Sequence, residues 1–184
     1  MISSTKRHRN EYRSRNKARP FHHSQALHIT MRSDIAVGPL SMTCPPIRVW
    51  VRSYIPRLAR RLGGRLYHFS NCGNHLHMVG KFESRAALAS FLRAASGMIA
   101  RKVLRSEKGS AATLKFWTER PFSRLVTWGR EFKSVVLYVH RNFLESTGRL
   151  MYIPRDRRVP VPMREFIRRS YECERKKIER VLMG

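Results

Sequence analysis

Two short stretches of alternating apolar and polar residues, 65–71 (RLYHFSN) and 75–82 (HLHMVGKF), are separated by only three residues. Side chains alternate between the two faces of a strand, so a period of two predicts two strands here. The intervening Cys72-Gly73-Asn74 has the composition of a tight turn. We therefore expect a β-hairpin, and because a hairpin joins antiparallel strands, the fold should contain an antiparallel sheet.

Further strands are indicated on both sides of the hairpin. Residues 26–34 alternate as a first strand, and a segment rich in aromatic and β-branched residues predicts another strand after Pro121. Between the first strand and the hairpin, Gly38 and the pair Pro45-Pro46 indicate a loop.

Three stretches carry apolar residues at helical spacing and end at glycine or begin at a capping serine. They are residues 47–64, 84–103 and 129–147. Pro56 in the first of them indicates a kink or a late start. The order strand, helix, strand, strand, helix, strand, helix predicts an α+β fold of the ferredoxin-like or RRM-like kind, with one antiparallel sheet and the helices packed on one of its faces.

The length of the chain and the composition of its ends indicate three parts. A chain of 184 residues most often forms one domain, which we expect to span residues 25–150. Residues 1–24 are basic and nearly free of aliphatic side chains, so they should form a flexible arm that either orders on a polyanion or only aids solubility. Residues 151–184 should form a basic linker and a C-terminal helix.

The chain carries 38 Lys and Arg against 12 Asp and Glu, a formal net charge of +26. This excess favours a polyanionic partner, nucleic acid above all, although ribosomal and membrane-surface proteins carry similar charge. No apolar run approaches the ~20 residues of a membrane span, and the first residues lack the apolar core of a signal peptide. The scattered Cys44, Cys72 and Cys173 favour a reducing compartment. We therefore expect a cytoplasmic, nucleoid-associated protein without a membrane partner.

The hairpin carries the first candidate site. His75 and His77 should point to the same face of one strand, about 7 Å apart along the backbone, while Leu76 points to the other face. Imidazoles placed in this way can chelate a divalent ion, but the hard cations of phosphate chemistry also need oxygen ligands, so a third ligand must come from elsewhere. The alternative is that both histidines are ordinary strand residues with hydrogen-bond partners.

The helix expected over residues 130–147 offers such a ligand. Its apolar stripe would lie on the sheet, and Tyr138 and Asn142, four residues apart, share one flank of that stripe. A phenol and a carboxamide so placed could present a nucleophile and a metal-binding oxygen to one phosphate. The alternatives are a half-buried packing role for Tyr138 and a plain surface position for Asn142. The stripe consists of Phe132, Val135, Val136, Val139 and Phe143.

The motif NHLHM, the Ala-rich helix after it, the stretch FWTERPFSRLV and the helix with YVHRN follow one another in this order. In this arrangement the chain resembles the Y1 tyrosine transposases of the IS200/IS605 type, especially their REP-associated relatives, within the HUH single-strand nuclease superfamily. The resemblance covers residues 26–148. It implies that His75 and His77 bind Mg²⁺ or Mn²⁺ with Asn142 as the third ligand, and that Tyr138 attacks DNA.

The resemblance thus predicts an enzyme, a metal-dependent transposase and endonuclease that cuts and rejoins single-stranded or hairpin DNA through a 5′-phosphotyrosine, working as a homodimer. Because imidazoles must be unprotonated to bind the metal, activity is expected to be lost below about pH 6. The alternatives are a domesticated protein that binds hairpins or single strands without cutting them, and an RNA-associated structural protein.

Further side chains have the chemistry to contact a DNA strand. Arginines either follow a phosphate backbone or form a solvated face, and aromatic rings either stack on exposed bases or belong to the core. The candidates are Arg57, Arg60, Arg61, Arg65, Trp117, Arg120 and Arg124, with Phe122 and Trp128 as further rings for stacking.

Overall fold

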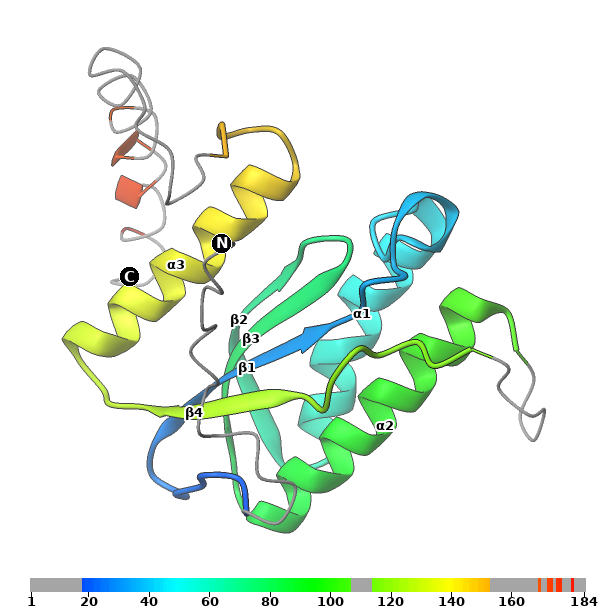
Figure 1. Cartoon of the computed structure of the whole chain (residues 1–184). Helices are drawn as coiled ribbons and strands as arrows, with labels where there is room; N and C mark the ends of the chain where they lie inside the picture. Colours follow the sequence, from blue (N-terminus) through cyan, green and yellow to red (C-terminus); the bar gives the residue numbers. More distant parts are fainter. Residues whose placement is uncertain are drawn as a thin grey trace, which may run out of the picture.

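A four-stranded antiparallel sheet organises the part of the chain that the structure describes (Figure 1). This computed structural model describes residues 18–106 and 114–152, and beyond them residues 169, 172, 173, 175, 176 and 180. The strands are β1 (Ala26–Arg32), β2 (Gly64–Asn71), β3 (His75–Phe82) and β4 (Phe122–Val126), in the spatial order β2-β3-β1-β4. The expected hairpin is the β2–β3 pair, and the predicted α+β, ferredoxin-like fold is confirmed.

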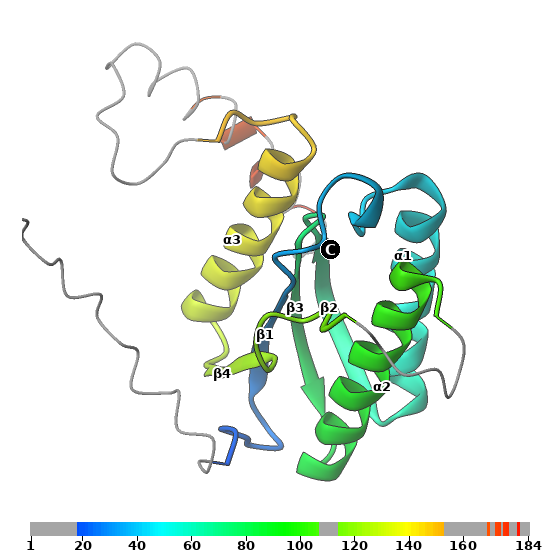
Figure 2. The same cartoon turned by 45° about the vertical axis from the view of Figure 1, so that its right-hand side comes forward.

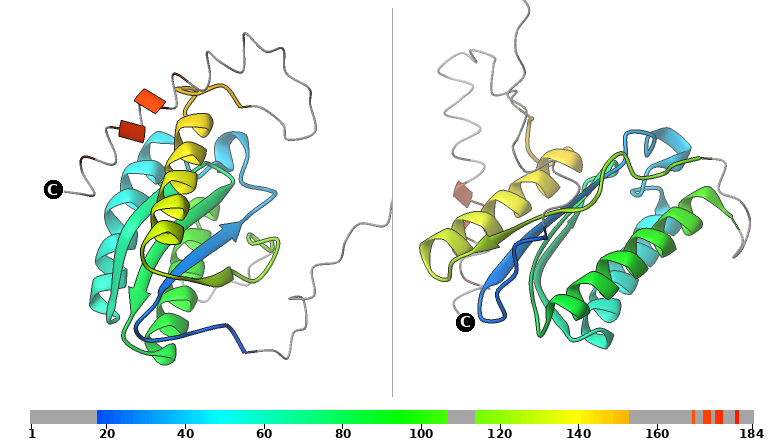
Figure 3. Two further views of the ribbon diagram at one scale, coloured as in Figure 1. Left: turned by 90° about the vertical axis from the view of Figure 1, so that its left-hand side faces the viewer. Right: turned by 60° about the horizontal axis from the view of Figure 1, so that its bottom comes forward.

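The helices cover both faces of this sheet. They are α1 (Pro45–Arg61), α2 (Arg85–Leu104) and α3 (Arg130–Ser146), and a short 3-10 helix, η2 (Gly38–Leu40), precedes α1. α1 and α2 lie on one face and α3 lies on the other (Figures 2 and 3), so our expectation that the helices share one face is wrong. The reason is that β1 and β3 carry apolar residues on both sides. Leu27 and Met78 join the core beneath α1 and α2, whereas Ala26 and Val79 pack against α3.

α1 begins earlier than the sequence indicates. Pro45 and Pro46, expected in a loop, are its first two residues. Proline is tolerated there because the N–H groups of the first turn have no partner within the helix. Pro56 lies inside the helix, so of the two alternatives for this proline, a kink or a late start, the late start is wrong. The start of α2 is as expected, since Ser84 Oγ accepts a hydrogen bond from the N–H of Ala87 at 3.0 Å.

A buried amide holds the turn between β2 and β3. Asn71 donates its Nδ2–H to Met42 O at 2.7 Å and accepts the N–H of Gly73 at 3.1 Å. Gly73 has a φ of +87°, which glycine adopts without the strain that a side chain would bring. This turn leads directly into His75, the first residue of β3.

Packing against the domain begins before residue 25. Phe21 packs against the core beneath α1 and α2, and Ser24 O accepts a hydrogen bond from Trp128 Nε1 at 2.6 Å. Residues 1–17 of the expected arm and most of the expected C-terminal segment, residues 151–184, lie outside the described residues. Within the described ranges, no helix is both long and apolar enough to cross a membrane.

Candidate active site

The sheet face beneath α3 carries a group of polar side chains, which lie beside the apolar residues that pack against that helix. Cross-strand partners share a face, and the register pairs His77 of β3 with Thr30 of β1 and with Ser70 of β2. His28, two residues before Thr30, lies on the same face. His28 and His77 are both buried, with 7% and 5% of their surface exposed. The sequence-predicted pair therefore has a third histidine beside it.

In each of the two predicted ligands, His75 and His77, only the Nδ1 atom has a hydrogen-bond partner among the described residues. His77 Nδ1 lies 3.1 Å from His28 Nε2 and 3.2 Å from Thr30 Oγ1, and His75 Nδ1 lies 2.6 Å from Asn74 Oδ1. The described residues form no hydrogen bond with Nε2 of either ring. The ring centroids of His75 and His77 are 4.8 Å apart. Metal-binding histidines commonly use one nitrogen for the ion and the other for a hydrogen bond that orients the ring, so this pair has the form of a metal-ligand pair.

Burial keeps these imidazoles neutral. It lowers the pKa of His77 to about 3 and that of His28 to about 4, and the nearby His75 and Arg124 strengthen the respective effects. Burial also lowers the pKa of His75. A neutral imidazole is the form that binds a metal ion, so at neutral pH the pair is in its ligand form.

α3 brings Tyr138 to the edge of these rings. Its valines pack on Val79 and Val126 of the sheet, and Tyr138 lies on the flank of that contact. The Tyr138 ring stands edge-on, with its centroid 5.6 Å from that of His77 and 6.0 Å from that of His28. It remains 39% exposed. The structure thus combines a solvent-accessible phenol with two buried, neutral imidazoles in one chain.

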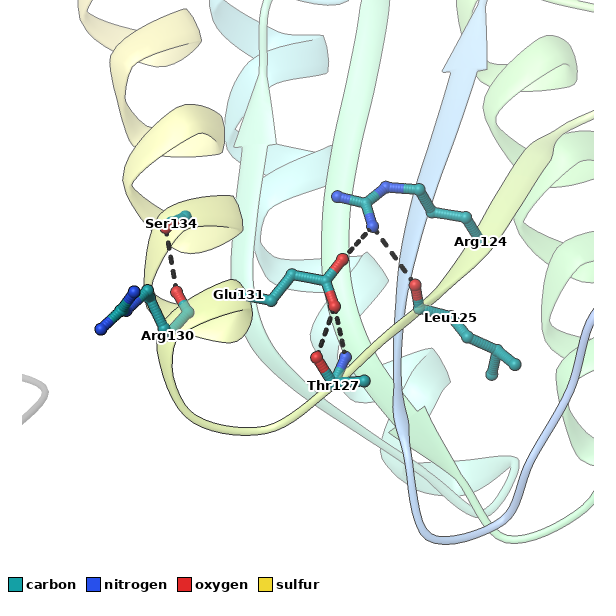
Figure 4. Close-up of polar contacts among 6 residues, drawn as sticks. All are labelled: Arg124, Leu125, Thr127, Arg130, Glu131 and Ser134. Atoms are coloured by element: carbon teal, nitrogen blue, oxygen red, sulfur yellow. Dashed lines mark hydrogen bonds and ion pairs between the residues drawn. The ribbon is translucent and has the colours of Figure 1, made fainter.

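The first turn of α3 is fastened to β4 by a carboxylate (Figure 4). Glu131 accepts hydrogen bonds from Thr127 N at 2.8 Å and Thr127 Oγ1 at 2.6 Å, and it forms an ion pair with Arg124. The bonds from Thr127, followed by that from Arg124, lower the pKa of Glu131 to about 2. Arg124 lies opposite His28 in the pairing of β4 with β1. Through Arg124, the ion pair with Glu131 therefore connects the strand that carries His28 to the helix that carries Tyr138.

Asn142 is one turn beyond Tyr138, as predicted, but its amide is bonded to its own helix. Its Nδ2 donates to Tyr138 O at 2.7 Å, which leaves Oδ1 as the atom able to bind a cation. No group of three or more His, Cys, Asp or Glu able to hold a metal occurs among the described residues. A divalent ion on His75 and His77 would therefore need oxygen from Asn142 Oδ1, water or substrate phosphate.

Two further histidines, His140 of α3 and His68 of β2, face each other on the side of α3 away from Tyr138. His140, which helical geometry turns away from Tyr138, has its ring centroid 5.6 Å from that of His68 on β2. This pair is separate from the His75–His77 pair. His28 was not anticipated, although the alternation in β1 puts it on the same face as Thr30. Only the strand order, which sets β1 beside β3, reveals that this face is shared with His77.

The predicted DNA-binding arginines lie mostly away from Tyr138. Arg57, Arg60 and Arg61 are exposed on α1, which covers the opposite face of the sheet. Arg65, at the start of β2, lies over the ring of Tyr67 at 5.4 Å. A hollow of about 310 Å³, called here the basic hollow, is lined by Arg60, Gly63, Gly64, Arg65, Tyr67, Lys81, Phe82 and Glu83. It lies at the strand ends remote from the β2–β3 turn.

The remaining candidates differ in exposure. Trp117 packs against the core, and its Nε1 donates to Ser96 O at 2.9 Å, so its indole has a structural role. Arg120 is exposed and lines a second surface hollow. Of the other rings, Phe122 and Trp128 are 43% and 46% exposed, which makes them the accessible ones on β4 and the turn after it.

Comparison with known proteins gives a likeness of fold. No protein-family model matches the chain, and no curated protein matches its sequence. The structure is similar to a solved structure of a REP-associated tyrosine transposase bound to a REP hairpin, with a TM-score of 0.50 and 11% sequence identity. The similarity covers 68% of this chain and 70% of that one. At this identity the likeness establishes the shared fold.

Proposed function

We propose that this chain is a divalent-metal-dependent tyrosine transposase and single-stranded DNA endonuclease of the REP-associated kind. The observation that carries the proposal is the position of Tyr138 beside His77, with the centroids of the two rings 5.6 Å apart. The net charge of +26 supports a DNA partner, and the fold shared with a hairpin-bound transposase supports a hairpin or single strand as the substrate.

In this proposal the metal ligands are Nε2 of His75, Nε2 of His77 and Oδ1 of Asn142. Mg²⁺ or Mn²⁺ bound there would offset the negative charge that builds up on the phosphate during attack. The hydrogen bonds at the two Nδ1 atoms orient the rings for this role before the ion arrives. The exposure of Tyr138 allows a DNA strand to reach the phenol without displacement of α3.

The reaction is an exchange of one phosphate ester for another. Tyr138 Oη attacks the phosphorus and loses its proton, the Oη–P bond forms as the P–O3′ bond breaks, and the 3′ oxygen leaves as a hydroxyl after taking up a proton. The product is a 5′-phosphotyrosine. Because the ester bond is conserved, another 3′-hydroxyl can reverse the step and join two strands without ATP. The homodimer belongs to the proposal through the family resemblance. The cytoplasmic, nucleoid-associated location belongs to it through the net charge and the scattered cysteines.

A second candidate function is hairpin or single-strand binding without cleavage. The observation in its favour is the Asn142 amide, whose Nδ2 donates to Tyr138 O within its own helix. A domesticated protein could keep the fold and the charge and lose the ion.

A denaturing gel separates these possibilities. The full chain is incubated with end-labelled single-stranded DNA containing a hairpin and with Mn²⁺, and then denatured. The proposal requires a covalent protein–DNA adduct that disappears in Tyr138→Phe and persists in Tyr152→Phe, a control tyrosine that is 66% exposed. Cleavage without an adduct would mean that water is the nucleophile, and binding without cleavage would support the second candidate.

A further inference from the structure

We infer that His28 is a positioning residue of the candidate active site, which holds the Nδ1 edge of His77 and supports the ring of Tyr138. No sequence motif assigns this residue a role. The inference rests on the proposed function, in that an ion on His77 is what the positioning serves.

The contact of His28 with His77 is direct and buried. His28 Nε2 lies 3.1 Å from His77 Nδ1, and the two rings stack with centroids 5.3 Å apart and planes at 19°. His28 is 7% exposed. On β1 it pairs with Val79, two residues beyond His77, so the neighbouring strand fixes its position.

This contact decides which nitrogen of His77 is available. A neutral imidazole has one N–H and one lone pair. If His77 donates Nδ1–H to His28 Nε2, the lone pair of His77 lies on Nε2, which has no hydrogen bond to the described residues. If the bond ran the other way, Nε2 of His77 would carry the hydrogen and could not bind an ion. Thr30 Oγ1 accepts or donates and fits both arrangements. A His28 ring with its hydrogen on Nδ1 can only accept at Nε2, and this tautomer of His28 places the hydrogen of His77 on Nδ1.

The same ring supports the phenol. Tyr138 stands edge-on to both imidazoles, at 82° to His28 and 81° to His77. Phenylalanine at position 28 would keep a flat ring under Tyr138 and lose the acceptor nitrogen. Glutamine would keep an acceptor near the position of Nε2 and lose the flat ring. The two substitutions therefore separate hydrogen bonding from packing.

The first test is Mn²⁺ binding to the full chain, measured at neutral pH by electron paramagnetic resonance of free Mn²⁺. We expect His28→Phe to weaken binding about 10-fold or more, the usual effect of losing a partner of a ligand histidine, and His28→Gln to stay within about threefold of the wild type. His68→Phe is the matched control, a histidine on the same sheet face that packs against His140, and it should bind as the wild type does. Wild-type affinity in His28→Phe, or an equal loss in both His28 variants, overturns the inference.

The second test needs no substitution and so does not depend on the variants folding. Long-range ¹H–¹⁵N correlation of the imidazoles in the metal-free, labelled wild-type chain reports which nitrogen of His77 carries the hydrogen. The inference requires Nδ1–H, and Nε2–H overturns it. A wild-type chain that shows this pattern and forms no DNA adduct would contradict the proposed function while leaving the role of His28 intact.

Discussion

The Arg124 side chain on β4 forms an ion pair with Glu131 in the first turn of α3, seven residues before Tyr138. Glu131 also accepts both hydrogen bonds that Thr127 offers. The contact therefore fixes where the helix starts relative to the sheet. Since Tyr138 lies two helical turns further along α3, the contact also helps to place the phenol beside His28 and His77.

Glu131→Gln should lower both stability and the rate of adduct formation. An exposed ion pair such as Arg124–Glu131 contributes about 0.2–1 kcal/mol. Weaker hydrogen bonds from Thr127 add to the loss, and the first turn of the helix that carries Tyr138 would be held less firmly. We expect a fall in melting temperature and an adduct rate several-fold lower in single-turnover reactions. Glu145→Gln is the control because its ion pair with Arg141 lies within α3. An unchanged rate in Glu131→Gln would show that the helix needs no such anchor.

Acid should destabilise the fold well above the pH at which its carboxylates titrate. Unfolded histidine titrates near ~6.5, whereas the pKa values are about 4 for His28 and His68 and about 3 for His77 in the folded chain. At pH values between the folded and unfolded pKa values, the unfolded chain binds more protons than the folded chain. The stability that the neutral rings contribute is therefore fully present above about pH 6.5 and is lost as the pH falls toward 4.

The expected loss at pH 5 is about 1 to 2 kcal/mol per buried ring, relative to pH 7.5. Urea unfolding at the two pH values measures it. The His68→Phe chain, which lacks one of these rings, should lose less over the same interval. Equal unfolding free energies at pH 7.5 and 5 would mean that the rings are accessible to protons in the folded state.

The pH at which catalysis fails should lie lower than an ordinary histidine pair suggests. The sequence alone led to an expected loss below about pH 6, but burial lowers the pKa of His75 and brings that of His77 to about 3. The ligand form therefore persists at lower pH. The adduct rate should remain near its neutral value at pH 5.5 wherever circular dichroism shows a folded chain. If the adduct rate of the folded protein fell to half near pH 6.5, this would contradict the lowered pKa values of His75 and His77.

The basic hollow allows a test of which predicted arginines contact DNA. Arg60, Arg65 and Lys81 come from three different elements and line one hollow, whereas Arg57 lies a turn earlier on α1 and outside it. If a DNA phosphate occupies the hollow, changing one of these three residues to Gln should reduce the slope of log affinity against log salt by about 1. Fluorescence anisotropy with single-stranded DNA measures this slope. Equal effects of Arg57→Gln and Arg65→Gln would indicate a diffuse basic surface.

Local patterns predicted most of the elements, because alternation and helical spacing reflect burial on one side. The hairpin and the flank shared by Tyr138 and Asn142 follow from such spacing. The side of the sheet that α3 covers depends instead on Ala26 and Val79 forming a second apolar surface, and this requires the strand order. His28 eluded prediction for the same reason, since it is one of 8 histidines until β1 is placed beside β3.

Tyr138 and His77 meet within one chain, and for the proposed homodimeric transposase this arrangement has a genetic consequence. If two defective alleles were expressed together, one with Tyr138→Phe and the other with His77→Ala, no subunit in any mixed assembly would possess an intact site. Such alleles should fail to complement each other, however well their products associate.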